Sequence, residues 1–309
     1  MKQTAKEKWA IPLAFFTIYT VWGSTYLASW YVLQDIPPLL TAGSRLFSAG
    51  IILYALSLFY GNPRVTLGQC KNAAISGIMF LTIGTGGMVC AAQYIASSML
   101  ALMVAFQPLL ILLLMWQMDG KKPTLKGLLG TALGMTGMAF LVLQDQFISN
   151  ENTLIGIACV LVSLLSWGTA SVRIAKMDMP TSKLQSSGIQ MLVGGGILLI
   201  ASLGTGEMNE LQISDLSERA VWSWLYLVIF GSVIAFSAFN FLLIASTPEK
   251  VATSNYVNPV VAMLLGWGLN NEHISGQSFL ASILLISGVI VINTRFSALK
   301  SLSFVRNTG

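Results

Sequence analysis

Ten long apolar segments, separated by short polar connections, account for nearly all of this 309-residue chain. They cover residues 9–31, 39–60, 72–92, 97–117, 126–143, 153–172, 184–204, 220–242, 248–269 and 276–294. Each is close to the roughly 20 residues that an α-helix needs to cross a bilayer. The chain is only 9% charged, whereas soluble domains are about 25% charged. These features exclude a soluble or disordered protein and predict an all-α membrane protein with ten transmembrane helices.

The basic residues predict how these helices are oriented. Cytoplasmic connections of membrane proteins carry an excess of Lys and Arg. If the chain starts inside and alternates, 15 of its 17 Lys and Arg residues lie on the inner side. Both termini are therefore expected in the cytoplasm. The net charge of +5 then reflects orientation in the lipid bilayer, and no nucleic-acid partner is expected.

An internal repeat divides the chain into residues 9–143 and 153–294. Trp22-Gly23-Ser24-Thr25 returns as Trp167-Gly168-Thr169-Ala170, and at the same spacing Arg45 corresponds to Gln190. Further on, Gln107-Pro108 corresponds to Asn258-Pro259. Each half holds five predicted helices, and because five is odd, the second half must enter the membrane from the opposite side. The sequence thus predicts two inverted five-helix repeats, an arrangement that many secondary transporters use for alternating access.

Several of these motifs resemble the EamA family of the drug/metabolite transporter superfamily, and the resemblance covers nearly the whole chain. It is carried by Trp22–Tyr26, by Pro37-Pro38 through Arg45, by Ser166-Trp167-Gly168 and by Ala252–Ala262. The resemblance implies two EamA repeats and an exporter of amino acids, related metabolites or drugs in the bacterial inner membrane. Similar members often have an acidic residue or Asn before the proline of the last block. Here that residue is Asn258, which removes a candidate proton carrier.

Arg45 is the one clear ionisable residue inside a predicted span. Such residues are costly in a membrane and are candidates for function. Arg45 could attract a substrate carboxylate, or its side chain could extend to the interface or bind free carbonyl groups. Its repeat partner Gln190 is also a candidate for substrate contact; it can form hydrogen bonds but is uncharged, so any attraction by charge is confined to the outer half of the protein.

Two prolines near the middle of the membrane, Pro108 and Pro259, are expected to kink their helices. Each lacks an N–H group and displaces the preceding turn, which should free carbonyl groups near Val104 and Asn255. Free backbone groups at this depth are tolerated only inside protein or beside a wet cavity. Four nearby polar residues are therefore candidates for substrate contact: Gln107, Asn240, Tyr256 and Asn258. The alternative is passive kinks with every amide satisfied between helices.

The paired Trp22-Gly23 and Trp167-Gly168 motifs combine an aromatic ring with a small residue. The tryptophans, with Ser24 and Thr25, are expected to form a gate or a binding wall. The glycines are expected to let helices pack closely, as small residues do in membranes.

No catalytic, cofactor or metal site is expected. Cys70, Cys90 and Cys159 lack the spacing of a zinc site, and His273, the single histidine, is expected in a solvated outer loop. The favoured function is a secondary transporter that exports amino acids, other small metabolites or drugs. An intramembrane enzyme and a channel-like bundle remain alternatives, although no His-Glu-x-x-His motif occurs. Both a monomer and a homodimer remain open.

Overall fold

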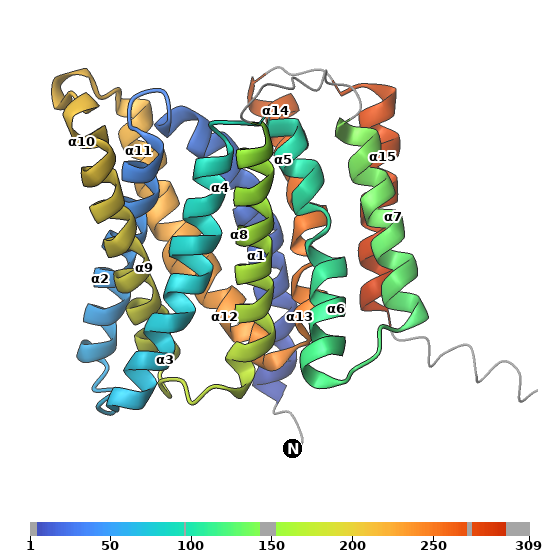
Figure 1. Cartoon of the computed structure of the whole chain (residues 1–309), viewed down its shortest axis with the longest axis horizontal. Coiled ribbons are helices and arrows are strands. Elements are labelled where there is room, and N and C mark those ends of the chain that lie inside the picture. Colours follow the sequence, from blue (N-terminus) through green and yellow to red (C-terminus); the bar gives the residue numbers. More distant parts are fainter. Residues whose placement is uncertain (1–4, 96, 143–152, 271–273, 295–309) are drawn as a thin grey trace, which may run out of the picture.

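In a computed structural model of the chain, the described residues are 5–95, 97–142, 153–270 and 274–294. They form helices joined by turns and short loops, without any strand in these ranges. The helices stand side by side as a bundle (Figure 1). The prediction of an all-α membrane protein is confirmed.

The first half contains seven helical segments in its first four spans and an eighth at the end. They are α1 (Ala5–Val32), α2 (Pro38–Phe59), α3 (Leu67–Gly77) continued by the π-helix η1 (Ile78–Thr85) and α4 (Gly86–Ala91), α5 (Ser97–Val104), α6 (Gln107–Asp119) and α7 (Leu125–Val142).

The second half has the same plan, with two short extra helices between its second and third spans. Its segments are α8 (Thr153–Arg173), η2 (Ile174–Lys176), α9 (Lys183–Thr205), α10 (Glu207–Glu210), η3 (Ile213–Asp215), α11 (Glu218–Tyr226) continued by the π-helix η4 (Leu227–Ile234) and α12 (Ala235–Ala245), α13 (Pro248–Val251), α14 (Ser254–Asn270) and α15 (Gly276–Asn293). The polar connection at 205–219 is therefore partly helical.

Within the described part of the chain, nine helical segments are long and apolar enough to cross a membrane. The expected ninth span is interrupted: α13 ends at Val251 and α14 begins at Ser254 with 17 residues. The count of ten spans stays a prediction. The first helices of the two halves, α1 and α8, run in opposite directions (Figure 1), as an inverted repeat requires.

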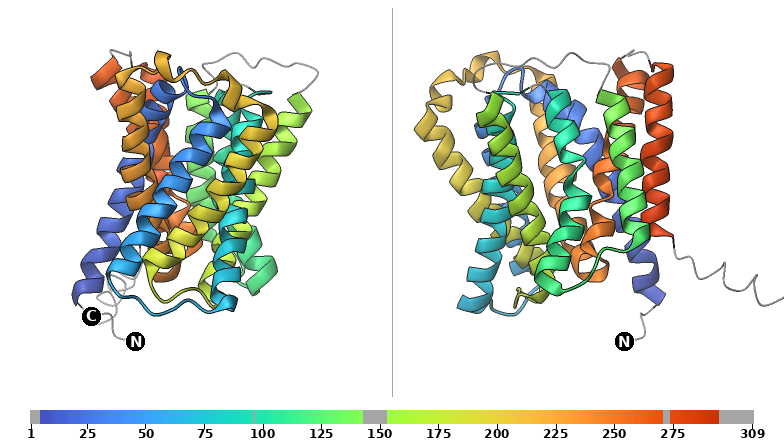
Figure 2. Two further views of the ribbon diagram at one scale, coloured as in Figure 1. Left: turned by 90° about the vertical axis from the view of Figure 1, so that its left-hand side faces the viewer. Right: turned by 45° about the vertical axis from the view of Figure 1, so that its right-hand side comes forward.

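Glycines hold equivalent helices of the two halves together. A Cβ atom at Gly50 of α2 would lie 2.6 Å from the backbone nitrogen of Leu192 on α9, and one at Gly195 would lie 2.5 Å from that of Phe47. The α7–α15 pair packs in the same way at the edge of the bundle (Figure 2). Small residues allow this close approach in membranes. Equivalent helices of the two repeats therefore pack directly against each other.

Both halves carry a π-helical segment in their third span. The segments η1 and η4 have eight residues each and start at Ile78 and Leu227. π-Helical turns are rare and are often found at functional sites. Sequence hydropathy gives no sign of either, because an inserted residue leaves the apolar run unbroken.

Candidate functional site

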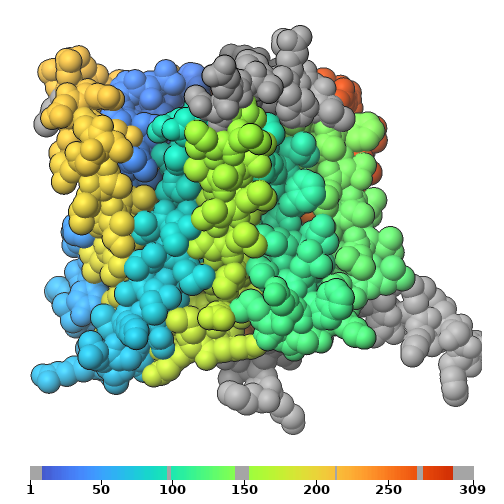
Figure 3. Space-filling model, in the orientation of Figure 1, coloured from blue at the N-terminus to red at the C-terminus, as the bar shows by residue number. Residues whose placement is uncertain are grey.

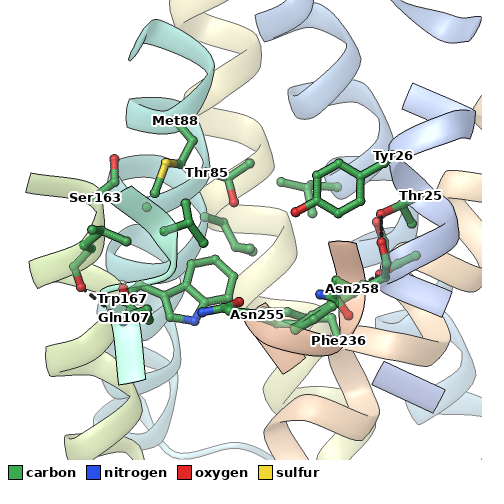
Figure 4. A pocket seen from close by; sticks show the side chains of 18 of the residues that line it. Thr25, Tyr26, Thr85, Met88, Gln107, Ser163, Trp167, Phe236, Asn255 and Asn258 are labelled. Carbon is green, nitrogen blue, oxygen red and sulfur yellow. Dashed lines mark hydrogen bonds between the residues drawn. The ribbon is translucent and has the colours of Figure 1, made fainter. Parts of the chain in front are cut away.

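A pocket of about 340 Å³ lies inside the bundle and is lined by helices of both halves. The space-filling view shows α3, α8 and α6 packed side by side on one face of the molecule (Figure 3). Within the pocket, Tyr26 of α1 faces Met88 and Ser163 across the open space (Figure 4). The residues that line the pocket are Trp22, Thr25, Tyr26, Arg45, Leu46, Leu81, Gly84, Thr85, Met88, Leu100, Val104, Gln107, Ser163, Leu164, Trp167, Met191, Gly231, Ser232, Phe236, Asn255 and Asn258.

Most of the residues predicted to contact substrate line this pocket. They are Trp22, Thr25, Arg45, Gln107, Trp167 and Asn258. They come from both halves of the sequence, so the structure brings together side chains that are up to 236 positions apart. Their contact with a substrate stays a prediction.

The other four predicted residues do not line the pocket and have hydrogen-bond partners inside the bundle. Ser24 donates to the Val21 carbonyl and pairs with the Tyr226 hydroxyl at 2.5 Å. Gln190 donates to Ser186, and Asn240 donates to Ser187 at 3.0 Å.

Tyr256 is likewise fully buried away from the pocket. Its hydroxyl donates to the Ala105 carbonyl at 3.1 Å and lies 3.4 Å from that of Thr131. Ala105 follows the end of α5, so Tyr256 satisfies one of the carbonyl groups that the helix break exposes.

The two prolines lie in different settings. Pro108 is in the first turn of α6, and the helix is broken between Val104 and Gln107. Pro259 lies inside the continuous helix α14, and the break in that span comes earlier, at Ala252 and Thr253. The breaks are thus not at equivalent positions in the two halves.

Sequence reasoning missed several polar lining residues, among them Tyr26, Thr85, Ser163, Ser232 and Asn255. Tyr26 and Asn255 belong to the motif blocks at Trp22–Tyr26 and Ala252–Ala262, which was a usable signal. Thr85 ends η1 and Ser232 lies within η4. The π-helical register that turns them toward the pocket has no hydropathy signature.

Three polar atoms of lining residues are buried without a hydrogen-bond partner among the described residues: Arg45 Nε, Gln107 Oε1 and Asn258 Oδ1. The Gln107 side chain is anchored through its Nε2, which donates to the Leu164 carbonyl at 3.3 Å. Buried polar groups normally have partners. Unpaired groups of both characters, a cation and two acceptors, therefore lie in the wall of the pocket.

Aromatic rings form a layer at one end of the pocket. Trp22 and Trp167 lie 6.4 Å apart between ring centroids, and both contact Phe239, at 5.2 and 5.6 Å. Phe80 and Phe236 complete the layer, with Phe80 5.1 Å from Trp167. A smaller pocket of about 40 Å³ lies beyond Trp22 and Trp167, which line both spaces. The aromatic layer separates the two.

A hydrogen-bonded layer lies farther along the same path. The hydroxyl groups of Tyr19 and Thr253 share a hydrogen bond of 2.6 Å, and Asn293 donates to the same Thr253 oxygen at 3.3 Å. Tyr19 is one turn nearer than Trp22 to the start of α1. The large pocket is thus closed toward the face at which α1 begins, the lower face in Figure 1.

Side chains from the first helix of each half bond the π-helical segment of the other half. Trp22 Nε1 of α1 donates to the Gly231 carbonyl of η4 at 3.1 Å. Ser166 and Ser163 of α8 donate to the Met79 and Ile83 carbonyls of η1, at 2.8 and 3.2 Å. Each of these sets of hydrogen bonds, which we call clamps, therefore joins the two repeats beside the pocket.

No cluster of three or more His, Cys, Asp or Glu suited to a metal occurs among the described residues, and His273 lies outside them. Cys70 is exposed. The thiols of Cys90 and Cys159 lie 3.5 Å apart and are not bonded as a disulfide.

Comparisons with known proteins point to one family. The EamA-like transporter family matches residues 8–143 and 154–294. An Escherichia coli (strain K12) protein named uncharacterized inner membrane transporter YedA is 34% identical over 281 residues, which cover 90% of this chain and 89% of that protein. Protein PecM of Dickeya dadantii is 26% identical and covers 88% of both chains. One solved crystal structure has the same fold, with a TM-score of 0.76 and 18% identity over 92% of this chain and 97% of its own.

Proposed function

This chain belongs to the EamA-like transporter family, and from that premise and the pocket we propose that it is a secondary transporter that exports small metabolites by alternating access. The favoured substrates are amino acids and related metabolites or drugs. The proposed location is a bacterial inner membrane, in keeping with the name of the E. coli relative, with both termini in the cytoplasm.

The observation that carries this proposal is a pocket shared by two inverted repeats and closed at one end only by side chains. Its volume of about 340 Å³ falls in the range of about 300–1,000 Å³ found for small-molecule sites. The closing layer is built around Trp22 and Trp167, which occupy equivalent positions in the two halves. An exchange of roles between the halves would open this layer and close the other end, as inverted-repeat transporters do.

The basic residues of the described part support the proposed orientation. The connections at the face where α1 begins carry Arg64, Lys121, Lys122, Lys176 and Lys250. At the other face, Arg219 is the basic residue found among the described residues of the connections. If the basic face is cytoplasmic, the large pocket is closed toward the cytoplasm and the structure is an outward-facing state.

Counterflow tests the proposal directly. The purified full-length protein is placed in liposomes loaded with an unlabelled solute, and uptake of the labelled solute is followed at zero membrane potential. A panel of amino acids, organic acids and amines is used, with protein-free liposomes as control. Transient accumulation of at least one solute is expected. If every member of a broad panel equilibrates at the protein-free rate, the transporter proposal is wrong.

A further inference from the structure

The large pocket contains a positive charge that no acidic group among the described residues neutralises. Arg45 lies on α2, seven residues after its first residue Pro38, and lines the pocket. Its Nε is buried without a hydrogen-bond partner. None of the described lining residues is Asp or Glu. Removing one partner of a buried charge is costly, so an Arg kept in such a place is expected to find its counter-charge in the ligand.

Of the alternative roles considered for Arg45, binding of free carbonyl groups does not fit its surroundings. An Arg that satisfies a broken helix would donate to the carbonyl groups at the break. In this bundle the break after α5 is served by Tyr256, whose hydroxyl donates to the Ala105 carbonyl. The break before α14 is served by Thr253, which donates to the Lys250 carbonyl at 2.6 Å. The guanidinium is therefore available to a bound molecule.

Unpaired hydrogen-bond acceptors, in contrast to the Arg45 cation, lie elsewhere on the pocket wall. Gln107 Oε1 and Asn258 Oδ1 are acceptors without donors, and the two side chains are only 3% and 5% exposed. Gln107 lies beside Trp167, and Asn258 lies on the other side of the view, near Phe236 (Figure 4). An amide oxygen of this kind binds an N–H group, and the bond is stronger when the donor is charged.

The remaining wall is apolar and largely aromatic. Trp22, Trp167 and Phe236 line the same space as the polar groups. Aromatic faces bury a flat apolar body well and prefer edge or offset contacts with other rings. A ligand that satisfies the whole wall therefore needs three parts: an anion, an N–H donor and an apolar body.

Resting on the proposed function, we propose that the pocket selects small apolar or aromatic solutes that carry both a carboxylate and an N–H donor. The carboxylate binds the Arg45 guanidinium, and the donor binds the amide oxygens of Gln107 and Asn258. Cations that lack an acidic group are disfavoured, because they would place a second positive charge in a pocket that already holds one. This narrows the substrate expectation from sequence, which admitted drugs of any charge.

Three related probes separate the parts of the ligand. L-Phenylalanine has the carboxylate, the donor and the ring; 3-phenylpropionate lacks the donor; 2-phenylethylamine lacks the carboxylate. Binding to the purified full-length protein in nanodiscs is measured by calorimetry. The expected order of affinity is L-phenylalanine, then 3-phenylpropionate, then 2-phenylethylamine.

Substitutions assign each part to its residue. Arg45→Gln is expected to weaken both carboxylates by about tenfold or more and to strengthen binding of 2-phenylethylamine, because the repelling charge is removed, while Arg45→Lys retains part of the preference. Asn258→Leu is expected to bring L-phenylalanine close to 3-phenylpropionate and to leave the latter unchanged. Arg219→Gln is the matched control, because Arg219 is exposed and lies 4.9 Å over the Tyr31 ring, outside the pocket.

The inference is overturned if 2-phenylethylamine binds the wild type as tightly as the carboxylates, or if none of the probes binds. Equal weakening of all three probes by Arg45→Gln would also overturn it and would make Arg45 a structural residue. Counterflow is scored separately. Binding in the expected order without any counterflow would overturn the transporter proposal and leave this inference standing. Counterflow of amines alone would support the transporter proposal and overturn this inference.

Discussion

At the scale of single residues, Glu207 shows how a charge in a connecting segment can hold two helices together. It follows α9 at the start of α10 and is 8% exposed. Its carboxylate accepts the backbone N–H groups of Leu39 and Leu40 at 3.1 and 2.7 Å, and the Ser202 hydroxyl at 2.9 Å. Because α2 starts at Pro38 and has no side-chain cap of its own, Glu207 provides the cap from the other half.

We expect Glu207→Gln to lower the free energy of unfolding by about 1–2 kcal/mol. The amide keeps one acceptor oxygen but loses the charge that favours a helix N-terminus. Thermal unfolding of the purified protein measures the change. Glu210→Gln is the control, because Glu210 is exposed on the same short helix. Equal effects of the two substitutions would contradict the capping role.

Asp35, between α1 and α2, should contribute a pH-dependent part of the stability. Its carboxylate accepts the Ser217 hydroxyl at 2.6 Å and the Ser217 backbone N–H at 2.9 Å, and these bonds hold the pKa of Asp35 below its ordinary value. A lowered pKa in the folded state stabilises the protein above the unfolded pKa of about 3.9. This contribution is lost as the pH falls through the folded pKa. The difference in melting temperature between wild type and Asp35→Asn should therefore be largest at neutral pH and disappear in acid; a difference independent of pH would refute it.

At residue scale, the sequence could identify a polar candidate but not the face of the helix on which it lies. Arg45 was found because a charge inside an apolar run is rare and costly. Asn240 and Tyr256 were chosen for similar reasons of depth, yet they bond to Ser187 and Ala105 in the helix interfaces. In a bundle whose helices are apolar on most sides, hydropathy carries little information about direction.

At the scale of helices, the two π-helical segments connect the halves of the protein. Ser166 of α8 donates to the Met79 carbonyl of η1 at 2.8 Å, and Trp22 of α1 donates to the Gly231 carbonyl of η4 at 3.1 Å. Widened turns and side-chain bonds to carbonyl groups are recognised places for helices to bend. If the protein works by the proposed alternating access, these two segments are where we expect the third spans to bend.

The Ser166 clamp can be tested by removing one hydroxyl. Ser166→Ala is expected to cost about 1 kcal/mol of stability and to change the rate of counterflow, because the η1 carbonyl loses its partner across the repeat boundary. Thr136→Ala is the control: Thr136 donates to the Ala132 carbonyl of its own helix and is exposed. A counterflow rate equal to wild type in Ser166→Ala would show that the clamp plays no part in transport.

Helical elements were easier to predict than their interruptions. The runs that became α2, α9 and α15 have the apolar length that a span requires. The break at Pro108 also follows from residue chemistry, since proline cannot donate to the helix ladder. The break at Ala252 and Thr253 has no such residue and arises from packing, with Thr253 bonded to Tyr19 and Asn293.

At the scale of the whole molecule, orientation can be tested with a native residue. Cys70 is exposed near the start of α3, at the face predicted to be cytoplasmic. A membrane-impermeant thiol reagent should label it in inside-out vesicles and not in intact cells. Asn209→Cys on α10, in a variant without the native cysteines, should give the opposite pattern. Labelling of Cys70 in intact cells would invert the proposed topology and make the structure an inward-facing state.

In the proposed alternating access, the aromatic layer is the barrier between the pockets of about 340 and 40 Å³, since Trp22 and Trp167 line both of them. Removing part of this aromatic layer should connect the two pockets. In a cysteine-free variant, Ser171→Cys, on the wall of the smaller pocket, is expected to react poorly with thiol reagents added from the side of the large pocket. Adding Trp167→Leu should raise this reaction severalfold, because the ring that contacts Trp22, Phe80 and Phe239 is lost. Trp116→Leu, which alters a tryptophan outside both pockets, should not. If the two leucine variants behave alike, the layer is not the barrier, and alternating access at this site loses its structural basis.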